Sequence, residues 1–298
     1  MDRYRAMRVF VRIAETGGFA ETARQLHMSP PAVTRAVAAL EETIGTRLLT
    51  RTTRAVKLTE AGARYVEDCR RVLAAIEEAE AAAAGSYATP TGTLAVTSSV
   101  LFGQNYVMPI MTEFLDLHPQ VTGRMLLFDR VVNLVDEGID VAIRIGHLPD
   151  SSYTAIRVGS VRRVICGAPR YLEDKGLPRH PNDLANHRII AATSAWTSLE
   201  WRFGTDGAIA VNVKPALFSN SNEAAIGAAR SGWGLTRALS YQIGPDLIAS
   251  HLQIVLEDFE QPPLPIHIVH PEGRNASAKV RAFIDFARDR LRKNRLIN

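Results

Sequence analysis

The apolar positions at the start of the chain recur with the period of an α-helix. They are spaced three, four and seven residues apart, as on one helical face, and they are Met7, Phe10, Val11 and Ala14. The pattern predicts a helix over residues 4–15, which the pair Gly17–Gly18 ends. A second apolar set predicts a short helix directly afterwards, lined by Phe19, Ala23 and Leu26.

A turn and a clear helix start come next. Ser29 is a residue type favoured at the N-cap, and Pro30 is favoured at the first helical position. They predict a third helix to about residue 43, with Thr34 and Arg35 facing outward and an inward face of Val33, Ala36, Val37 and Leu40. Two short helices joined by a tight turn are typical of the helix-turn-helix, whose second helix presents its first residues to base edges in the major groove. We therefore predict DNA contacts at Ser29, Pro30, Thr34 and Arg35.

The stretch over residues 47–59 has the pattern of a β-hairpin. Leu49, Val56 and Leu58 bracket a basic tip that is rich in threonine. Such a hairpin beside a helix-turn-helix is a wing, and its cations would lie near phosphates or a narrow minor groove. The cations that we predict to contact DNA there are Arg51, Arg54 and Lys57.

Residues 60–84 form a long alanine- and glutamate-rich segment that predicts one helix, about 37 Å long at ~1.5 Å per residue. Its apolar residues repeat at alternating spacings of four and three, the heptad pattern of a helix–helix seam, and they are Tyr65, Cys69, Val72, Ile76, Ala79 and Ala83. Because a small winged module offers nothing for so long a stripe to pack on, we predict that Tyr65, Cys69, Val72 and Ile76 mediate dimerisation. The alternative is that the helix packs on its own C-terminal domain. Residues 85–92 then predict a hinge.

From residue 93 onward, strand-like and helix-like patterns alternate. They predict strands at 94–96, 121–128 and 141–143, and helices at 102–117 and 132–137. A second unit of this kind spans 162–263, and the chain returns through a strand at 266–269 to a last helix at 278–291, with Val280, Phe283, Ile284 and Ala287 on one face. Such alternation is typical of a mainly parallel sheet covered by helices.

The N-terminal stretch resembles the DNA-binding domain of LysR-type transcriptional regulators. The resemblance is carried by Ala32-Val33-Thr34-Arg35-Ala36-Val37-Ala38-Ala39-Leu40-Glu41, Gly45-Thr46-Arg47-Leu48-Leu49, Arg51, and Leu58-Thr59-Glu60-Ala61-Gly62. The chain departs from the family in having Ser29-Pro30-Pro31 where a glutamine is common, and Leu49 where phenylalanine is frequent. Gly138-Ile139-Asp140-Val141-Ala142-Ile143-Arg144 and Gly232-Trp233-Gly234-Leu235 match family patterns further along.

The resemblance covers essentially the whole chain and implies an architecture. We expect an α/β protein with a winged helix-turn-helix over 1–59, a linker helix and hinge over 60–90 that pairs antiparallel in a dimer, and an effector domain over 91–298. That domain resembles a periplasmic solute-binding protein, with lobe I at about 91–161 and 266–298 and lobe II at about 162–265. An activator of this family would also contact RNA polymerase.

Ligands of α/β sheets bind at the carboxyl ends of strands, where helix N-termini direct amide donors at anions. This rule predicts a site for a small organic anion between the lobes, formed by Ser98, Ser99, Arg144, Thr193, Ser194, Asn220 and Asn222. Ser99 and Asn222 have the alternative role of capping their helices. Arg144 is equally suited to a carboxylate ligand or to a salt bridge, and Trp196 and Trp201 either border the site or pack in the core.

Charge and composition sharpen this interpretation. Residues 1–58 hold ten basic and five acidic side chains, a net +5, whereas the remaining 240 residues hold 25 and 26, a net −1. A basic module on a neutral body favours a polyanion such as double-stranded DNA as partner, although a solvated charged face is the alternative. Cys69 and Cys166 have no metal-ligand spacing, so we expect both in the core, with no metal and no cofactor.

Other classes of protein fit less well. No apolar run approaches the ~20 residues of a membrane span, and the N-terminus lacks the pattern of a signal peptide, so we expect a cytoplasmic protein without a membrane partner. The motifs GxGxxG, GxxxxGK[ST], HExxH and GxSxG are absent, which argues against an enzyme. A periplasmic solute-binding protein would not need residues 1–60. The sequence therefore predicts an effector-responsive DNA-binding regulator that forms a dimer or tetramer.

Overall fold

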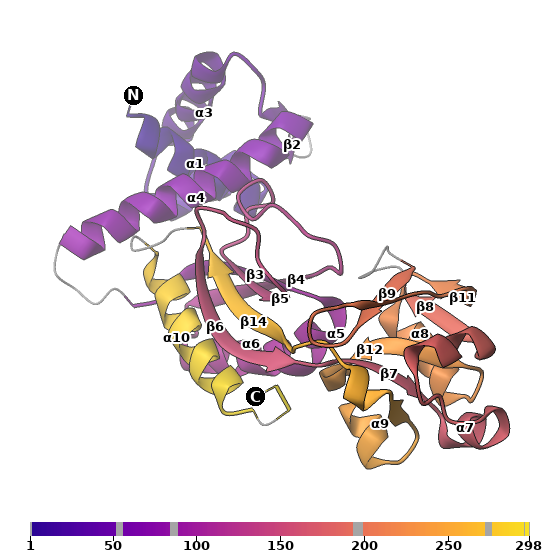
Figure 1. The fold of residues 1–298 in the computed structure, drawn as a ribbon. Coiled ribbons are helices and arrows are strands. Elements are labelled where there is room, and N and C mark those ends of the chain that lie inside the picture. The colour runs from indigo at the N-terminus through magenta and orange to yellow at the C-terminus, as the bar shows by residue number, and fades with distance from the viewer. Residues whose placement is uncertain are drawn as a thin grey trace. The chain divides into compact units, whose positions relative to one another are not determined.

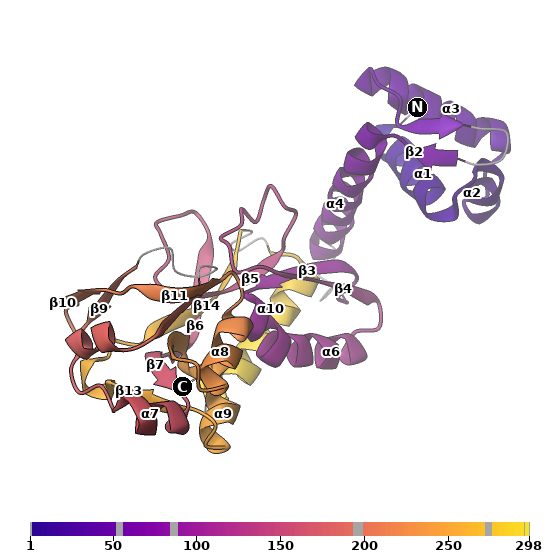
Figure 2. The ribbon, with the colours of Figure 1, turned by 90° about the vertical axis from the view of Figure 1, so that its right-hand side faces the viewer.

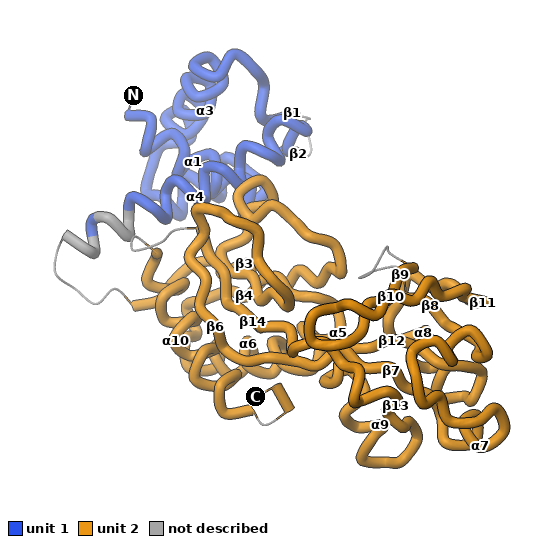
Figure 3. The backbone as a smooth tube through the Cα atoms, in the orientation of Figure 1, with its two compact units in different colours: residues 1–88 blue, residues 89–298 orange. Residues whose placement is uncertain are grey.

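The computed structural model describes residues 2–51, 56–83, 89–192, 199–271, 276–294 and 296–297. The chain divides into two compact units, residues 1–88 and residues 89–298 (Figure 3). Residues 85–88 of the predicted hinge at 85–92 lie outside the described residues.

Three helices form the base of the first unit (Figure 1): α1 (Arg3–Thr16), α2 (Phe19–Gln25) and α3 (Pro30–Ile44). Gly17 and Gly45 end α1 and α3 in the left-handed conformation, at φ of 69° and 77°, which glycine adopts without strain. The predicted inward face of the third helix is confirmed, because Val33, Ala36 and Val37 are fully buried and Leu40 is 1% exposed.

A two-stranded wing follows α3, made of β1 (Leu49–Arg51) and β2 (Val56–Leu58), which pair antiparallel. The Glu41 carboxylate ties α3 to the wing by accepting hydrogen bonds from the backbone amides of Leu48 and Leu49 at 2.8 and 3.0 Å. The helix α4 (Glu60–Ala83) begins directly after β2. Its Gly62 lies so close to the wing that a Cβ there would be 2.0 Å from the carbonyl oxygen of Leu48.

The prediction that α4 has nothing in its own module to pack on is wrong for the first half of this helix. Val66, Cys69 and Leu73 belong to the core of the first unit, and Phe10 of α1 contacts the Tyr65 ring at 5.9 Å between centroids. Cys69 is fully buried there. The heptad pattern therefore combines an intramolecular face with the outer positions Val72, 45% exposed, and Ile76, which is half-buried.

The second unit consists of two lobes, each built on a five-stranded sheet. The sheet of lobe I has the strand order β4-β3-β5-β14-β6. Its strands are β3 (Gly92–Ser98), β4 (Val121–Leu127), β5 (Val141–Ile145), β6 (Thr154–Val161) and β14 (Leu264–His270). The helices α6 (Met108–Leu117) and α10 (Ala278–Arg292) lie side by side along this lobe (Figure 2), with Phe114 and Phe283 in edge-to-face contact. The predicted inner face of the last helix is confirmed by the burial of Val280, Phe283, Ile284 and Ala287.

The sheet of lobe II has the order β11-β8-β12-β7-β13. Its strands are β7 (Arg163–Gly167), β8 (Ile189–Ala192), β11 (Pro215–Ser219), β12 (Leu235–Leu239) and β13 (Gln253–Val255). A separate hairpin, β9 (Glu200–Phe203) with β10 (Ile209–Asn212), contributes Trp201, Phe203 and Val211 to a core shared with Ile165 and Leu235. The remaining helices of lobe II are α7 (Pro169–Lys175), α8 (Asn222–Arg230) and α9 (Gly244–Ile248), with short 3₁₀ turns η2 (Pro181–Asn186), η3 (Ser240–Gln242) and η4 (Glu257–Phe259).

The chain crosses between the lobes twice, from β6 into β7 and from η4 into β14. Each sheet is mixed rather than mainly parallel. In lobe I, β3 is parallel to β4 and β5, and β14 is antiparallel to β5 and β6. In lobe II, β8 is parallel to β11 and β12, and β7 is antiparallel to β12 and β13.

Two predicted elements of lobe I differ in the structure. The helix predicted at 132–137 is a turn over residues 134–138, because the Asn133 side chain accepts a hydrogen bond from the backbone of Val135 and Gly138 ends the turn at φ 62°. The helix predicted at 102–117 is longer and less regular. It consists of α5 (Val100–Phe102), a π turn η1 (Gly103–Val107) and α6.

Candidate DNA-binding surface and effector-binding junction

The start of α3 presents its outer face to solvent. Arg35 and Ala38 are exposed and Thr34 is half-buried, whereas their neighbours Val33 and Ala36 are fully buried. This alternation follows from the helical period, and it leaves the Arg35 guanidinium at the surface of a rigid helix. A cation on the first turns of the second helix is what base-edge recognition needs.

The two residues before this face fix where the helix begins. The Ser29 hydroxyl accepts a hydrogen bond from the backbone amide of Ala32 at 3.4 Å, and Pro30 occupies the first helical position. Both are exposed, as a DNA-contacting position must be. The Ser29 hydroxyl therefore already has a structural role as the cap of α3.

The described strands of the wing carry part of the predicted basic set. Lys57 is exposed on β2, where its backbone pairs with Thr50 of β1. Arg51 is the last residue of β1, and its side chain lies outside what the structure describes. Arg54 lies outside the described residues altogether.

Two of the predicted effector residues of lobe I, Ser98 and Ser99, lie at the carboxyl end of β3. Ser98 is the last residue of β3 and 4% exposed, and its hydroxyl oxygen has no hydrogen-bond partner among the described residues. Ser99 occupies the N-cap position of α5, but its side chain makes no capping bond. The Ser99 hydroxyl therefore does not cap α5, which was the alternative role for this residue.

A hydrogen bond joins the two lobes at this edge. The Asn222 side-chain amide, at the start of α8 in lobe II, donates to the Asp129 carboxylate of lobe I at 3.4 Å. The other oxygen of Asp129 accepts from the backbone amide of Val100 at 3.1 Å. Asn222 is 6% exposed and does not cap α8, because Ser221 performs that role through the backbone amide of Ala224. We use the term lobe junction for the pair Asn222 and Asp129 together with Ser98, Ser99, Phe102, Tyr106 and Tyr241.

Three aromatic rings pack across the lobe junction. Tyr241 of η3 meets Phe102 and Tyr106 of lobe I edge-on, at 5.1 and 5.6 Å between ring centroids. Phe102 and Tyr106 stack on each other at 4.9 Å. Burial raises the pKa of Tyr241 to about 12, so its phenol stays neutral.

Sequence reasoning did not identify Asp129 and Tyr241, although the rule that selected Ser98 applies to both. Asp129 follows the carboxyl end of β4 and Tyr241 follows that of β12. No motif around Asp129 or Tyr241 marks either residue in the sequence. The two residues come together only because the lobes pack against each other.

The other predicted effector residues differ in position. Arg144 lies at the end of β5 and donates to the carbonyl oxygen of Val132 at 2.6 Å, so it braces the turn after β4. Asn220 is exposed in the loop between β11 and α8. Trp201 is buried in the lobe II core at 3% exposure, which answers the alternative for this residue. Thr193, Ser194 and Trp196 lie outside the described residues.

The two cysteines are free and buried, as predicted. Within the described residues, no group of three or more histidine, cysteine or acidic side chains could hold a metal ion. Over the same part of the chain, no helix is long and apolar enough to cross a membrane.

A winged helix-turn-helix joined to a two-lobed α/β unit defines the class of ligand-responsive DNA-binding regulators. Two family models match the chain: the bacterial regulatory helix-turn-helix protein of the lysR family over residues 4–63, and the LysR substrate binding domain over residues 88–292. The chain therefore belongs to the LysR family of transcriptional regulators, which bind DNA and carry an effector-binding domain.

Individual relatives cover nearly the full length. An HTH-type transcriptional regulator of Xanthomonas campestris is 35% identical over 95% of this chain and 84% of that protein. An HTH-type transcriptional repressor of Pseudomonas aeruginosa is 30% identical over 99% of this chain and 94% of that protein. The structure of CrgA, a LysR-type transcriptional regulator from Neisseria meningitidis, matches with a TM-score of 0.63 and 27% identity over 97% of this chain and 99% of that one.

Proposed function

We propose that the chain recognises a specific operator through the outer face of α3. The observation that carries the proposal is the exposure of Arg35 on a helix whose opposite face is fully buried, because a guanidinium held this way can donate two hydrogen bonds to a guanine. Thr34 and the capped start of α3 at Ser29 and Pro30 lie beside it. Arg51, Arg54 and Lys57 of the wing would add sequence-independent contacts with phosphates.

The effector site that we infer lies at the lobe junction. Its support is the buried Ser98 hydroxyl at the end of β3, which has no hydrogen-bond partner among the described residues, together with the bond between Asn222 and Asp129 that joins the lobes. A small organic anion could accept the hydrogen bond of the Asn222 amide in place of Asp129. The ligand would then connect the lobes where the bond between Asn222 and Asp129 connects them now. Such a ligand changes the balance between lobe arrangements, and any effect on DNA affinity must come from that difference. Thr193, Ser194 and Asn220 are the further residues that we assign to this site, with Arg144 positioning the turn beside it.

The dimer that we propose pairs the outer face of α4, where Val72 is 45% exposed and Ile76 half-buried. Tyr65 is half-buried and packs against the core of the first unit, in which Cys69 is fully buried. A two-fold dimer presents two copies of α3, so its operator would be palindromic with half-sites one helical turn or a multiple apart.

The mode of action that follows is binding rather than catalysis, and it takes place in the cytoplasm, where the operator is. One relative is named an activator, AaeR of Escherichia coli, and another a repressor. If this chain activates, RNA polymerase is a further partner.

A gel-shift with the DNA upstream of the protein's own gene and its divergent neighbour tests the DNA half of the proposal. We expect a retarded complex that survives an excess of unrelated DNA and a footprint with two equivalent halves. Retardation that the unrelated DNA abolishes would leave only non-specific binding and overturn the proposal.

The effector half has its own test. A thermal-shift screen of small organic acids on the full chain should find compounds that raise the unfolding midpoint of the wild type but not of Ser98→Ala, because this substitution removes the hydroxyl without adding an atom. Equal shifts in both proteins would place the ligand elsewhere.

A further inference from the structure

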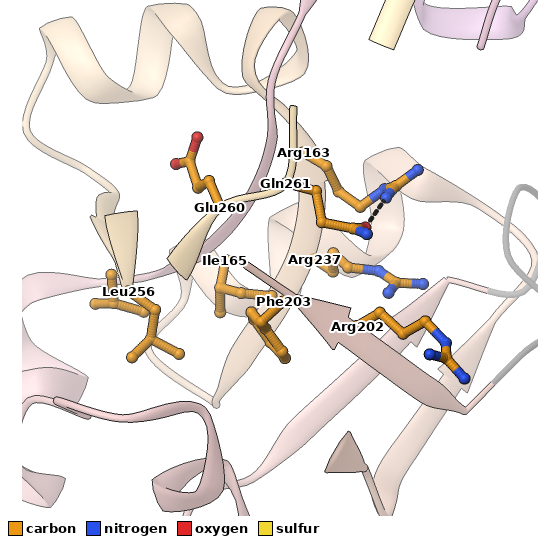
Figure 4. Close-up of a pocket in the computed structure, with 9 residues that line it drawn as sticks. Arg163, Ile165, Arg202, Phe203, Arg237, Leu256, Glu260 and Gln261 are labelled. Carbon is orange, nitrogen blue, oxygen red and sulfur yellow. Dashed lines mark hydrogen bonds between the residues drawn. The ribbon is translucent and has the colours of Figure 1, made fainter. Parts of the chain in front are cut away.

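The second unit contains two groups of basic side chains outside the lobe junction. One lines a pocket of lobe II with Arg163, Arg202 and Arg237 (Figure 4). The cavity there is about 10 Å³, which is room for about one water molecule, and Arg163 donates to Gln261 across it. This pocket is therefore too small for an organic ligand. The other group lies on one face of the lobe I sheet.

The group in lobe I is a row of three residues across neighbouring strands. His267 of β14 pairs with Arg144 of β5 on one side and with Arg157 of the edge strand β6 on the other. Side chains of directly paired residues lie on the same face of a sheet, ~4.5–5.5 Å apart at Cβ. Like charges in such positions repel each other, so an anion bound beside the row would stabilise it.

No carboxylate neutralises this row within the part of the chain that the structure describes. The Arg144 guanidinium donates to the carbonyl oxygen of Val132, and Arg157 forms no ion pair there. Burial, and after it the positive charges of Arg157 and His147, lower the pKa of His267. The charges that act on the His267 ring are therefore positive, and His147 is close enough to belong to the same group.

The segment 146–153, which carries His147, crosses the face of the row. Both β5 and β6 are antiparallel to β14, which lies between them, so the segment that joins β5 to β6 has to pass over one face of the sheet. Leu148 of this segment packs against the cluster that contains Val269, and Val269 lies two residues from His267, on the same face. The segment thus brings the exposed side chain of His147 to the face that carries His267.

His267 has a polar atom without a partner. Its Nδ1 is buried and has no hydrogen-bond partner among the described residues. The pairing of β14 with β6 shifts register directly before His267 and leaves Val158 as an extra residue on β6. Such bulges are frequent beside functional sites, where they redirect a side chain. A buried polar atom of this kind costs free energy unless water or a ligand pairs with it.

We propose that lobe I binds a phosphate group on this face through His147, Arg157 and His267. The three side chains come from three elements, and a phosphate group offers them three oxygens and up to two negative charges, whereas a carboxylate offers two oxygens and one charge. Arg144 adds positive charge from the other side of His267. The phosphate group belongs either to a small molecule or to a DNA backbone.

The three proposed ligands of the phosphate group belong neither to the lobe junction nor to the DNA contacts proposed for α3 and the wing. The site in lobe I is therefore independent of both. Arg292 of α10 donates to the backbone carbonyl oxygen of Arg157 at 3.0 Å, so a further cation borders the site at the edge of the sheet.

NMR of the full chain with isotope-labelled histidine tests the proposal, with inorganic phosphate replacing chloride at constant ionic strength. We expect the ring signals of His147 and His267 to shift until they saturate, and the signal of His251, exposed in lobe II, to stay unchanged. Bound phosphate should also raise the pKa of His267, because an anion favours the protonated ring. Arg157→Gln should weaken phosphate binding about tenfold or more, because it removes a charge-assisted contact.

Arg124→Gln is the matched control, because Arg124 is exposed on β4, the opposite edge of the same sheet, and this variant should bind phosphate as the wild type does. Both substituted side chains are exposed, and thermal unfolding verifies that both variants fold. A DNA duplex in place of phosphate identifies the source of the group. A His267 response to the duplex that Arg157→Gln removes assigns the site to DNA, and a response to inorganic phosphate alone assigns it to a small molecule. His267 signals that neither titrant moves would overturn the proposal, as would equal phosphate affinities of the wild type and Arg157→Gln.

Discussion

At the scale of single residues, Gly62 determines how closely α4 can approach the wing. The backbone amide of Gly62 donates a hydrogen bond to the Thr59 hydroxyl at 2.9 Å, and the Thr59 hydroxyl in turn donates to the carbonyl oxygen of Arg47 at 2.8 Å. These bonds bring the first turn of α4 against Leu48, which is fully buried. A side chain at position 62 has no space, because the Leu48 backbone occupies it.

Gly62→Ala should therefore destabilise the first unit by about 1–3 kcal/mol, since the new methyl group would have to displace the backbone of Leu48. In an unobstructed helix the same exchange stabilises, by about 0.5–1 kcal/mol. Gly227→Ala in α8, where a Cβ would meet nothing within 4 Å, is the matched control and should show that gain. Chemical unfolding of the full chain measures both, and changes of the same sign would contradict the steric account.

We propose that Arg35 contacts a base and Lys57 a phosphate, and their alanine variants should separate these two kinds of DNA contact. Arg35→Ala should cost ~1–3 kcal/mol on the operator and much less on unrelated DNA, because its contact is to a base. Lys57→Ala should weaken both DNAs by similar factors and lower the salt slope of binding by ~1, because its contact is to a phosphate.

Equilibrium binding at several salt concentrations, on operator and on unrelated DNA, measures these effects. If Arg35→Ala weakened both DNAs equally, Arg35 would be a backbone contact. A salt slope that Lys57→Ala leaves unchanged would remove the wing residue from the interface.

At the scale of elements, local signals predicted the first unit well. The helical period located α1 and α3, and Ser29 with Pro30 marked the start of α3 to the residue. These elements depend on contacts close in the sequence, so their patterns are readable without the fold. The packing partner of α4 was harder to predict, because residues of one heptad pattern have different surroundings. Cys69 is buried in the core of the first unit, whereas Val72 is exposed.

Elements that depend on distant contacts were less predictable. The turn at 134–138 carries apolar residues at helical spacing, but Leu134 is buried in a cluster with Ala142 and Val269, and the Asn133 side chain competes for the backbone. The antiparallel strands β14 and β7 arise from the way the chain crosses between lobes, which no local pattern records. For the same reason the contact between Asp129 and Asn222, 93 residues apart, could not be foreseen.

The outer face of α4 provides the prediction at this scale. In the dimer that we propose, Ile76 lies in an apolar seam, so Ile76→Glu should dissociate the dimer and reduce operator affinity together, because an unpaired carboxylate there is costly. Ala75→Glu adds the same charge at an exposed position about 100° around the helix and should leave both properties nearly unchanged. Light scattering after size exclusion gives the oligomeric state and a gel-shift gives the affinity. A dimeric Ile76→Glu protein that binds normally would show that α4 does not form the seam.

At the scale of the whole molecule, the regulatory unit is a pair of lobes joined by two crossings of the chain and by packed side chains. Beyond the two crossings of the chain, the described contacts between the lobes include the bond between Asn222 and Asp129 and the packing of Tyr241 on Phe102 and Tyr106, within an apolar cluster that takes buried residues from both lobes. A ligand can rearrange these contacts only by its difference in affinity for the two arrangements of the lobes.

Charge placed at this contact should shift that equilibrium without a ligand. Asn222→Asp sets a second carboxylate against Asp129, at a position only 6% exposed, so the lobes should repel each other there. We expect a fall in the thermal midpoint of several degrees at neutral pH. The deficit should shrink as the pH falls toward 5, because protonation of one carboxyl of the pair removes the repulsion. Asn220→Asp, two residues earlier and exposed, adds the same charge outside the contact and should cost little at either pH. Differential scanning calorimetry of the three proteins at both pH values decides the matter, and a deficit that is equal for the two variants, or independent of pH, would mean that the lobes are not held together through Asp129.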